Sequence, residues 1–140
     1  MLKKETFKVL IIEDDLNSNL TLKNILKIGQ YSVRSSICDV RIEEVLKLEP
    51  EIIILKLPLQ TRNGFEVLKN LKTNENTKHI PVVIITKLNT QLYWEAAYQL
   101  GADAYIVTPR HYPYILRKLN RVRSKTKNWN NYFIQNTIAI

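Results

Sequence analysis

The chain has 140 residues, of which 45% are apolar and 24% are charged, and its formal net charge is +8. This length suits one domain, and this composition excludes a disordered or fibrous chain. No stretch reaches the roughly 20 apolar residues that span a bilayer, and the N-terminal apolar run lacks a signal-peptide cleavage site, so we expect a cytoplasmic protein with no membrane contact. Cys38 is the only cysteine, which excludes an internal disulfide and a cysteine-based zinc site.

Apolar runs of about six residues alternate with helical patterns, and this alternation occurs five times. The predicted strands are Phe7–Ile12, Tyr31–Ile37, Ile52–Leu55, Pro81–Thr86 and Ala104–Val107. The predicted helices are Leu16–Ile28, Val40–Leu48, Gly64–Leu71, Gln91–Leu100 and Tyr112–Lys125. Strands that are apolar throughout and separated by helices indicate a parallel sheet covered on both faces. The sequence therefore predicts an α/β fold with a doubly wound, five-stranded parallel sheet, that is, a flavodoxin-like (βα)5 domain.

Local signals support several of these boundaries. Asp39 is a predicted N-cap for the second helix, and Asp15 is one for the first helix. Gly29 and Gly101 follow the first and fourth helices, where a glycine commonly ends a helix. Asn63 and Gly64 predict a tight turn into the third helix.

In such a fold, ligands bind beyond the carboxyl ends of the strands. The residues at these ends are Glu13 and Asp14 after the first strand, Lys56 after the third, Thr86 and Lys87 after the fourth, and Thr108 and Pro109 after the fifth. We expect them to share one crevice. His79 and His111 have no ligand-spaced companions and are expected to be surface residues, and no Ser-His-Asp or HExxH pattern is present, so we do not expect an enzyme.

Four motifs resemble the receiver domain of bacterial two-component response regulators, the CheY-like family. They are IIEDD, LPLQTRNGFEVLK, PVVIIT and GADAYIVTP, and the resemblance covers residues 6 to 123. It implies the receiver fold and a role in phosphorelay signalling. It also implies that Glu13 and Asp14 match the acidic pair that holds Mg²⁺, that Thr86 matches the hydroxyl residue that binds the phosphoryl group, and that Tyr105 matches the aromatic switch residue.

The sequence departs from the family pattern at the residues that carry the chemistry. Lys56 stands where the resemblance implies the phosphoacceptor aspartate, and Thr108 stands where it implies a phosphate-binding lysine. Lys87 replaces a small residue and could cover the crevice. An ammonium group cannot serve as the carboxylate nucleophile, and it occupies the place of a metal ion. The sequence thus predicts a degenerate pseudo-receiver without Mg²⁺, in which Glu13 and Asp14 are vestigial metal ligands and no other cofactor is bound.

Lys56 is predicted to pair with Asp14 and Glu13, because adjacent carboxylates repel when no cation lies between them. Two interpretations stay open. In the first, Lys56 replaces Mg²⁺ and locks one state of a switch. In the second, catalysis has been lost and Lys56 only neutralises the remaining acids.

Two surfaces could bind partners. The fourth helix, fifth strand and fifth helix carry the predicted anchors Trp94, Tyr98, Tyr105, Arg117 and Arg121.

We divide the chain into a receiver-like domain (residues 1–127) and an aromatic, apolar tail (residues 128–140). The tail is expected either to pack on its own domain or to form an arm that pairs with another subunit. A signalling protein such as a histidine kinase, another regulator or a second copy of the chain is the predicted partner.

The positive charge is concentrated near the C-terminal end, which leaves an alternative function open. Residues 110–127 contain seven of the 21 basic residues and no acid: Arg110, Arg117, Lys118, Arg121, Arg123, Lys125 and Lys127. Such a cluster can attract nucleic acid, although a charged helix face is more often simply solvated. The first hypothesis is therefore a stand-alone pseudo-receiver that acts by protein–protein contact, and the alternative is a nucleic-acid-associated regulator that uses the basic last helix.

Overall fold

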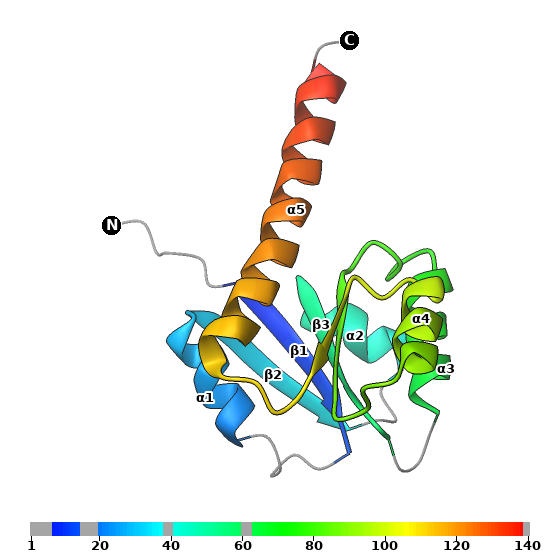
Figure 1. Ribbon diagram of the computed structural model, residues 1–140. Coiled ribbons are helices and arrows are strands. Elements are labelled where there is room, and N and C mark those ends of the chain that lie inside the picture. The colour runs from blue at the N-terminus through cyan, green and yellow to red at the C-terminus, as the bar shows by residue number, and fades with distance from the viewer. Residues whose placement is uncertain (1–6, 15–19, 38–40, 60–62, 139–140) are drawn as a thin grey trace.

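The computed structural model describes residues 7–14, 20–37, 41–59 and 63–138, and for Leu20, Ile37 and residues 126–138 it describes the backbone alone. Within these residues, one parallel sheet carries the strands in the order β2-β1-β3-β4-β5 (Figure 1). The strands are β1 (Phe7–Glu13), β2 (Tyr31–Ile37), β3 (Ile52–Leu57), β4 (Val82–Thr86) and β5 (Ala104–Val107). The predicted doubly wound α/β fold is confirmed.

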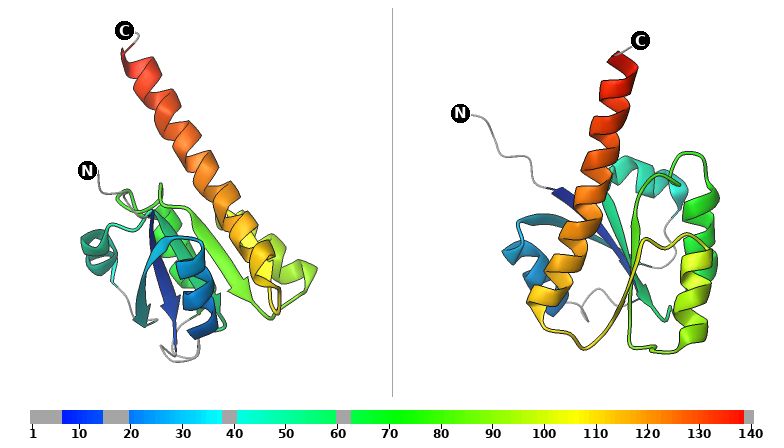
Figure 2. Two further views of the ribbon diagram at one scale, coloured as in Figure 1. Left: turned by 90° about the vertical axis from the view of Figure 1, so that its left-hand side faces the viewer. Right: turned by 45° about the horizontal axis from the view of Figure 1, so that its top comes forward.

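Helices cover both faces of this sheet. They are α1 (Leu20–Ile28), α2 (Ile42–Leu48), α3 (Gly64–Thr73), α4 (Gln91–Gln99) and α5 (Tyr112–Ile138). Helices α1 and α5 lie on one face, and α2, α3 and α4 lie on the other (Figure 2). Each helix between two strands forms a crossover connection, and the connection from β2 to β3 passes over β1, which lies between them in the sheet.

The period-2 alternation of the strands divides the core into two clusters. Leu10, Ile53 and Ile84 face α2, α3 and α4, whereas their sequence neighbours Ile11 and Ile54 face α1 and α5. Both sets are at most 2% exposed, which explains why these strands are apolar at nearly every position. The same alternation decides the face onto which each polar residue at a strand end points.

Several helix ends differ in detail from the sequence-based expectation. Helix α2 begins at Ile42, and its N-cap residue is Arg41, which makes no side-chain capping hydrogen bond; Asp39 and Asp15 lie outside the described residues. Asn63 does cap α3, since its Oδ1 accepts a hydrogen bond of 3.0 Å from the Phe65 N–H. Gly101 adopts φ = 102° immediately after Leu100, the C-cap of α4, so its predicted role in ending that helix is confirmed.

The last helix is much longer than predicted. It does not end at Lys125 but continues to Ile138, so it has 27 residues and is about 40 Å long. Figures 1 and 2 show its C-terminal part projecting from the body of the domain, so the backbone of residues 128–138 does not fold back onto the sheet. Within the described residues, no helix combines the length and the apolar character that a membrane span needs.

Candidate functional site

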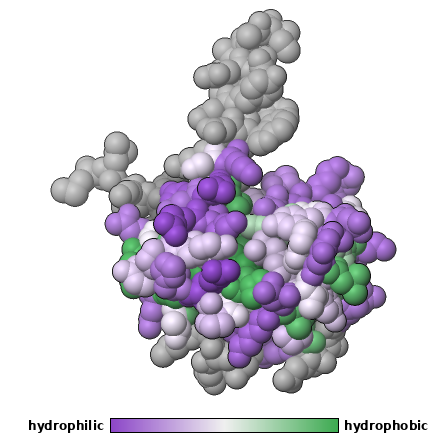
Figure 3. All heavy atoms as spheres, viewed as in Figure 1, coloured by the Kyte–Doolittle hydropathy of each residue, from purple (hydrophilic) through white to green (hydrophobic). Residues whose placement is uncertain are grey.

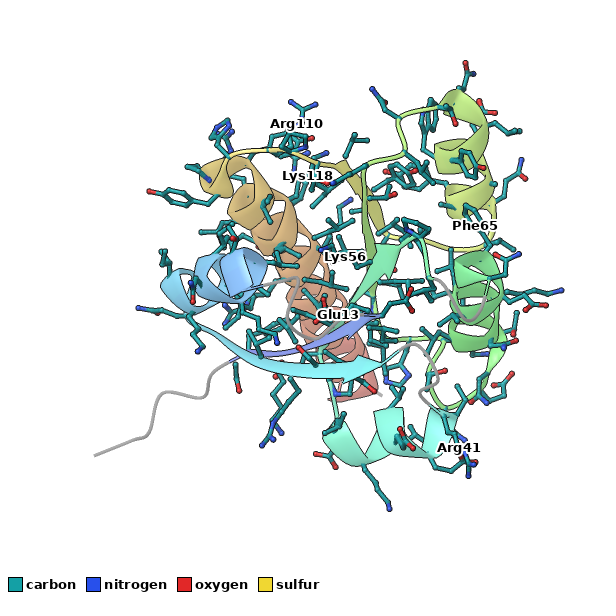
Figure 4. The ribbon with its side chains drawn as sticks, turned by 90° about the horizontal axis from the view of Figure 1, so that it is seen from below. Glu13, Arg41, Lys56, Phe65, Arg110 and Lys118 are labelled. Atoms are coloured by element: carbon teal, nitrogen blue, oxygen red, sulfur yellow. The ribbon has the colours of Figure 1, made fainter. Side chains whose placement is uncertain are left out.

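Glu13 and Lys56 lie side by side at the carboxyl end of the sheet. Ile12 of β1 is in register with Leu55 of β3, and Glu13 and Lys56 are the next residues of the two strands. Neighbouring parallel strands are about 4.8 Å apart. Both side chains continue the alternation that puts Ile11 on the α1/α5 face, so the carboxylate and the ammonium point the same way. Figure 4 shows them together at the centre of this end of the domain.

Glu13 and its sequence neighbour Asp14 bury carboxylate oxygens away from water. Glu13 is 1% exposed, and both of its carboxylate oxygens and Oδ1 of Asp14 are buried. Lys56 is half-buried. A buried carboxylate is costly unless an opposite charge compensates for the lost hydration. An ammonium in the adjacent strand is placed to provide that charge.

Thr86 and Tyr105 point to the other face of the sheet, and one residue joins them. Thr86 Oγ1 accepts a hydrogen bond of 3.1 Å from the Leu88 N–H, and the Tyr105 hydroxyl donates one of 2.9 Å to the Leu88 carbonyl oxygen. Sequence reasoning missed Leu88, because its backbone and not its side chain makes both bonds. Two predicted site residues therefore hold the loop between β4 and α4.

The environment of Tyr105 favours its neutral form. Burial raises the pKa of the Tyr105 phenol, and the nearby Tyr93 raises it further. A neutral phenol keeps the proton that it donates to Leu88. Ionisation of the phenol therefore does not break this hydrogen bond at neutral pH.

The remaining predicted residues surround a single cavity of about 800 Å³. Seven of the eight residues that the sequence singled out line this cavity, namely Glu13, Asp14, Lys56, Thr86, Lys87, Thr108 and Pro109. Tyr105 is the exception, because it faces α3 and α4. Within the described part of the chain, no three His, Cys, Asp or Glu side chains are grouped as metal ligands.

Sequence reasoning missed the opposite wall of this cavity. It consists mainly of α1 and α5 residues and the loop before α5: Thr21, Leu22, Ile25, Arg110 and Ile115. Ile25 and Ile115 belong to the apolar faces of their helices, which the sequence identified only as core positions. That they border a cavity depends on the spacing between the two helices, which helical periodicity does not encode.

Residues 9–120 match the family described as the response regulator receiver domain. The polar-differentiation response regulator DivK of Brucella ovis is 31% identical over 109 residues, which are 77% of this chain and 89% of DivK. The chain belongs to the response regulator receiver domain family.

A further relative is similar over most of this chain, and solved structures share its fold. The sensory transduction protein BceR of Halalkalibacterium halodurans is 26% identical over 124 residues, and this chain spans about half (52%) of its length. The chemotaxis protein CheY4 of Vibrio cholerae superposes with a TM-score of 0.74 at 22% identity, over 84% of this chain and 99% of CheY4. The receiver domain of a LuxO-type repressor from Vibrio parahaemolyticus gives 0.78 at 20% identity, over 91% of this chain and 98% of that one.

The fourth helix of this receiver carries an aromatic surface. Trp94 is 37% exposed and Tyr98 is 46% exposed, and their ring centroids are 6.4 Å apart in an edge-on arrangement. Tyr93 stacks on Phe65 of α3 with a centroid separation of 6.0 Å. Trp94 and Tyr98 are therefore exposed on this helix, and their role as partner anchors stays a prediction.

The basic residues of α5 and of the loop before it do not all have the same surroundings. Arg117 and Arg121 are exposed, as expected, and hydrophilic side chains cover much of this side in Figure 3. Arg110 and Lys118 lie over the Tyr114 ring, with their charged groups 4.9 Å and 5.8 Å from its centroid. These ring contacts divide the cluster into smaller groups.

Arg123 of α5 turns inward and lies against two aromatic rings. Its guanidinium carbon lies 4.5 Å from the Phe7 ring centroid and 5.7 Å from that of Tyr31, at the first residues of β1 and β2. Arginine suits this inward position because its planar, weakly hydrated cation stacks on aromatic rings.

Proposed function

We propose that this chain is a receiver of two-component signalling that acts by protein–protein contact without being phosphorylated on its third strand. The observation that carries the proposal is the position of Lys56, in register beside Glu13 at the end of β3. Family resemblance implies an aspartate there. Phosphoryl transfer to this strand needs a carboxylate oxygen as nucleophile, and an ammonium group has no such oxygen. We propose no enzymatic role for this crevice.

The site as a whole does not fit the Mg²⁺ ion that the family implies. Mg²⁺ is commonly held by one or two carboxylates completed by water, and Glu13 and Asp14 offer two carboxylates. The third strand contributes a cation at the same face of the sheet, and that cation would repel the metal. We therefore infer that Lys56 replaces the metal as the counter-charge of the acidic pair.

The hydrogen bonds of Leu88 support a fixed rather than a switched state. Thr86 and Tyr105 match the family residues that respond to a phosphoryl group, and both are already bonded to the backbone of Leu88. Lys56 supplies a permanent positive charge where the family pattern implies a Mg²⁺ ion. Of the two interpretations of Lys56, we propose the locked state, and its partners would bind constitutively.

The surface of α4 and α5 is the proposed partner site. Trp94 and Tyr98 provide exposed aromatic anchors, and Arg117 and Arg121 provide exposed cations on the neighbouring helix. A histidine kinase, another regulator or a second copy of the chain are the proposed partners. Nucleic-acid binding is the weaker alternative, because Arg123 turns inward onto the Phe7 and Tyr31 rings and leaves fewer cations on the outer faces of α5 for a phosphate backbone.

Intact-mass spectrometry after incubation with acetyl phosphate and Mg²⁺ tests the proposal. The wild-type chain is expected to gain no phosphoryl group. A Lys56→Asp/Thr108→Lys variant, which restores both departures from the family pattern, is expected to gain one. A labelled wild-type chain would refute the proposal, and peptide mapping of the modified acid would then begin at Asp15.

A further inference from the structure

The cavity at the carboxyl end of the sheet has an apolar side and a basic side. The apolar side is formed by Leu22 and Ile25 of α1, Ile85 of β4 and Ile115 of α5. Its volume of about 800 Å³ lies in the range of small-molecule pockets, which is roughly 300–1,000 Å³. A lone inorganic anion would leave most of this apolar wall uncovered.

The basic side lies at the rim. Lys87 and Arg110 are exposed and line the cavity, and among the described residues neither takes part in an ion pair. Arg110 is steadied by its contact with the Tyr114 ring. Figure 4 places Arg110 at the start of α5, away from the pair of Lys56 and Glu13 in the centre. The rim cations are thus separate from the cation that faces the buried acids.

We propose that this cavity binds a small organic anion with an apolar body. Its carboxylate or phosphate group would lie between Lys87 and Arg110. Both cations could then donate charge-assisted hydrogen bonds to it, which are stronger than hydrogen bonds between neutral groups. Its apolar body would lie against Leu22, Ile25 and Ile115. The inference rests on the proposed function. A crevice used for phosphoryl transfer would need Lys87 and Arg110 for its phosphate, so they would not be available to this ligand.

Such a ligand would affect Thr86 and Tyr105 through the backbone that follows Lys87. Lys87 directly precedes Leu88, whose backbone N–H and carbonyl bond Thr86 and Tyr105. An anion that moves Lys87 therefore acts on the loop that leads to α4 and its aromatic surface. Binding in the cavity would change how this surface meets a partner, so the ligand would replace phosphorylation as the input signal.

An NMR titration of the full chain with four eight-carbon probes tests the proposal. Octanoate and octyl phosphate are expected to shift the backbone amides of Lys87, Leu88 and Arg110. Octanol and octylammonium have the same apolar body without the negative charge, and at equal concentration they are expected to bind at least about tenfold more weakly. The two anions distinguish a carboxylate from a phosphate ligand.

A matched pair of double variants separates the rim from general charge effects. Lys87→Ala/Arg110→Ala is expected to weaken octanoate binding at least about tenfold, whereas Lys69→Ala/Lys78→Ala, which removes two exposed lysines elsewhere, leaves it unchanged. All four positions are exposed, so both variants should fold. The inference fails if no amide shifts at millimolar probe, if octanol binds as well as octanoate, or if both double variants weaken binding equally.

The phosphorylation experiment keeps the two proposals apart. A wild-type chain that takes up a phosphoryl group overturns the proposed function and this inference with it. A chain that stays unlabelled and is silent in the titration overturns only the ligand.

Discussion

Lys56 and Glu13 occupy equivalent positions in adjacent strands, so each affects the cost of burying the other. Removing the ammonium would leave the buried Glu13 carboxylate without its strand neighbour's charge. We expect Lys56→Ala to lower the free energy of unfolding by about 1–3 kcal/mol, below the full cost for a completely buried pair, because Lys56 is half-buried. Urea denaturation at neutral pH measures this loss.

The control is Lys87→Ala, which removes an exposed lysine one strand away. It should change stability by no more than about 0.5 kcal/mol. Adding Glu13→Gln to Lys56→Ala should recover part of the loss, because the neutral amide needs no counter-charge. Equal stability of wild type and Lys56→Ala would show that the two groups do not interact.

We expect the Tyr31 phenol to make the free energy of unfolding depend on pH in the alkaline range. Burial raises the pKa of the Tyr31 phenol above its ordinary value of 10.0, although the charge and hydrogen bond of Arg123 act in the opposite direction. The folded chain thus holds this proton more tightly than the unfolded chain. The stability contributed by Tyr31 is complete below about pH 10 and is lost as pH rises through the folded pKa.

We therefore expect Tyr31→Phe to flatten the decline of stability between about pH 9 and pH 11. Urea midpoints at both pH values, for wild type and variant, measure the slope. Tyr112→Phe is the control, since Tyr112 is 50% exposed and should leave the slope as it is. Parallel slopes for wild type and Tyr31→Phe would rule out the effect.

At the scale of elements, Gly64 allows α3 to approach β3. A Cβ atom at this position would overlap Cδ2 of Leu57 and lie 3.2 Å from its Cγ. Leu57 is 7% exposed in the core, so it can move only by disturbing its neighbours. We expect Gly64→Ala to destabilise the domain by about 1–3 kcal/mol, despite the higher helix propensity of alanine.

Thermal or urea unfolding of Gly64→Ala measures this effect. Lys69→Ala, at an exposed position of the same helix, is the matched control and should be nearly neutral. A stabilised Gly64→Ala chain would mean that helix propensity outweighs the overlap with Leu57.

Strand and helix positions were largely predictable because their signals are local. Ile52–Leu55 and Val82–Ile85 are apolar at every position, as strands buried on both faces must be. Helix boundaries were less predictable where capping was weak, as at Arg41, which bonds no backbone group with its side chain. The end of α5 was missed because the sequence after Val122 is polar for six residues and offers neither glycine nor proline as a stop signal.

At the scale of the whole molecule, the domain and the projecting part of α5 are expected to be energetically independent. Val122 is the last α5 residue described as buried. We expect truncation after Lys125 to leave the free energy of unfolding within about 0.5 kcal/mol of the full chain. Urea denaturation measures stability, and far-ultraviolet circular dichroism reports the helix that is removed.

A concentration series separates two reasons for any change. If truncation lowers stability only at high protein concentration, the removed helix pairs with a second chain. If it lowers stability by more than about 1 kcal/mol at every concentration, residues beyond Lys125 pack on their own domain, and the independence predicted above is wrong.

The sequence by itself determined the succession of strands and helices along the chain, the covering of both faces of the sheet and the set of polar residues at the carboxyl ends of the strands. These follow from hydrophobic periodicity and from the rule that parallel strands end at one edge, and both operate over short stretches of chain. Tertiary structure alone decided that the Tyr105 hydroxyl meets the Leu88 carbonyl, that Arg123 turns inward onto two rings, and that α1 and α5 line a cavity beside the acids. Each of these depends on the distance between segments far apart in sequence, and no local pattern of residues encodes that distance.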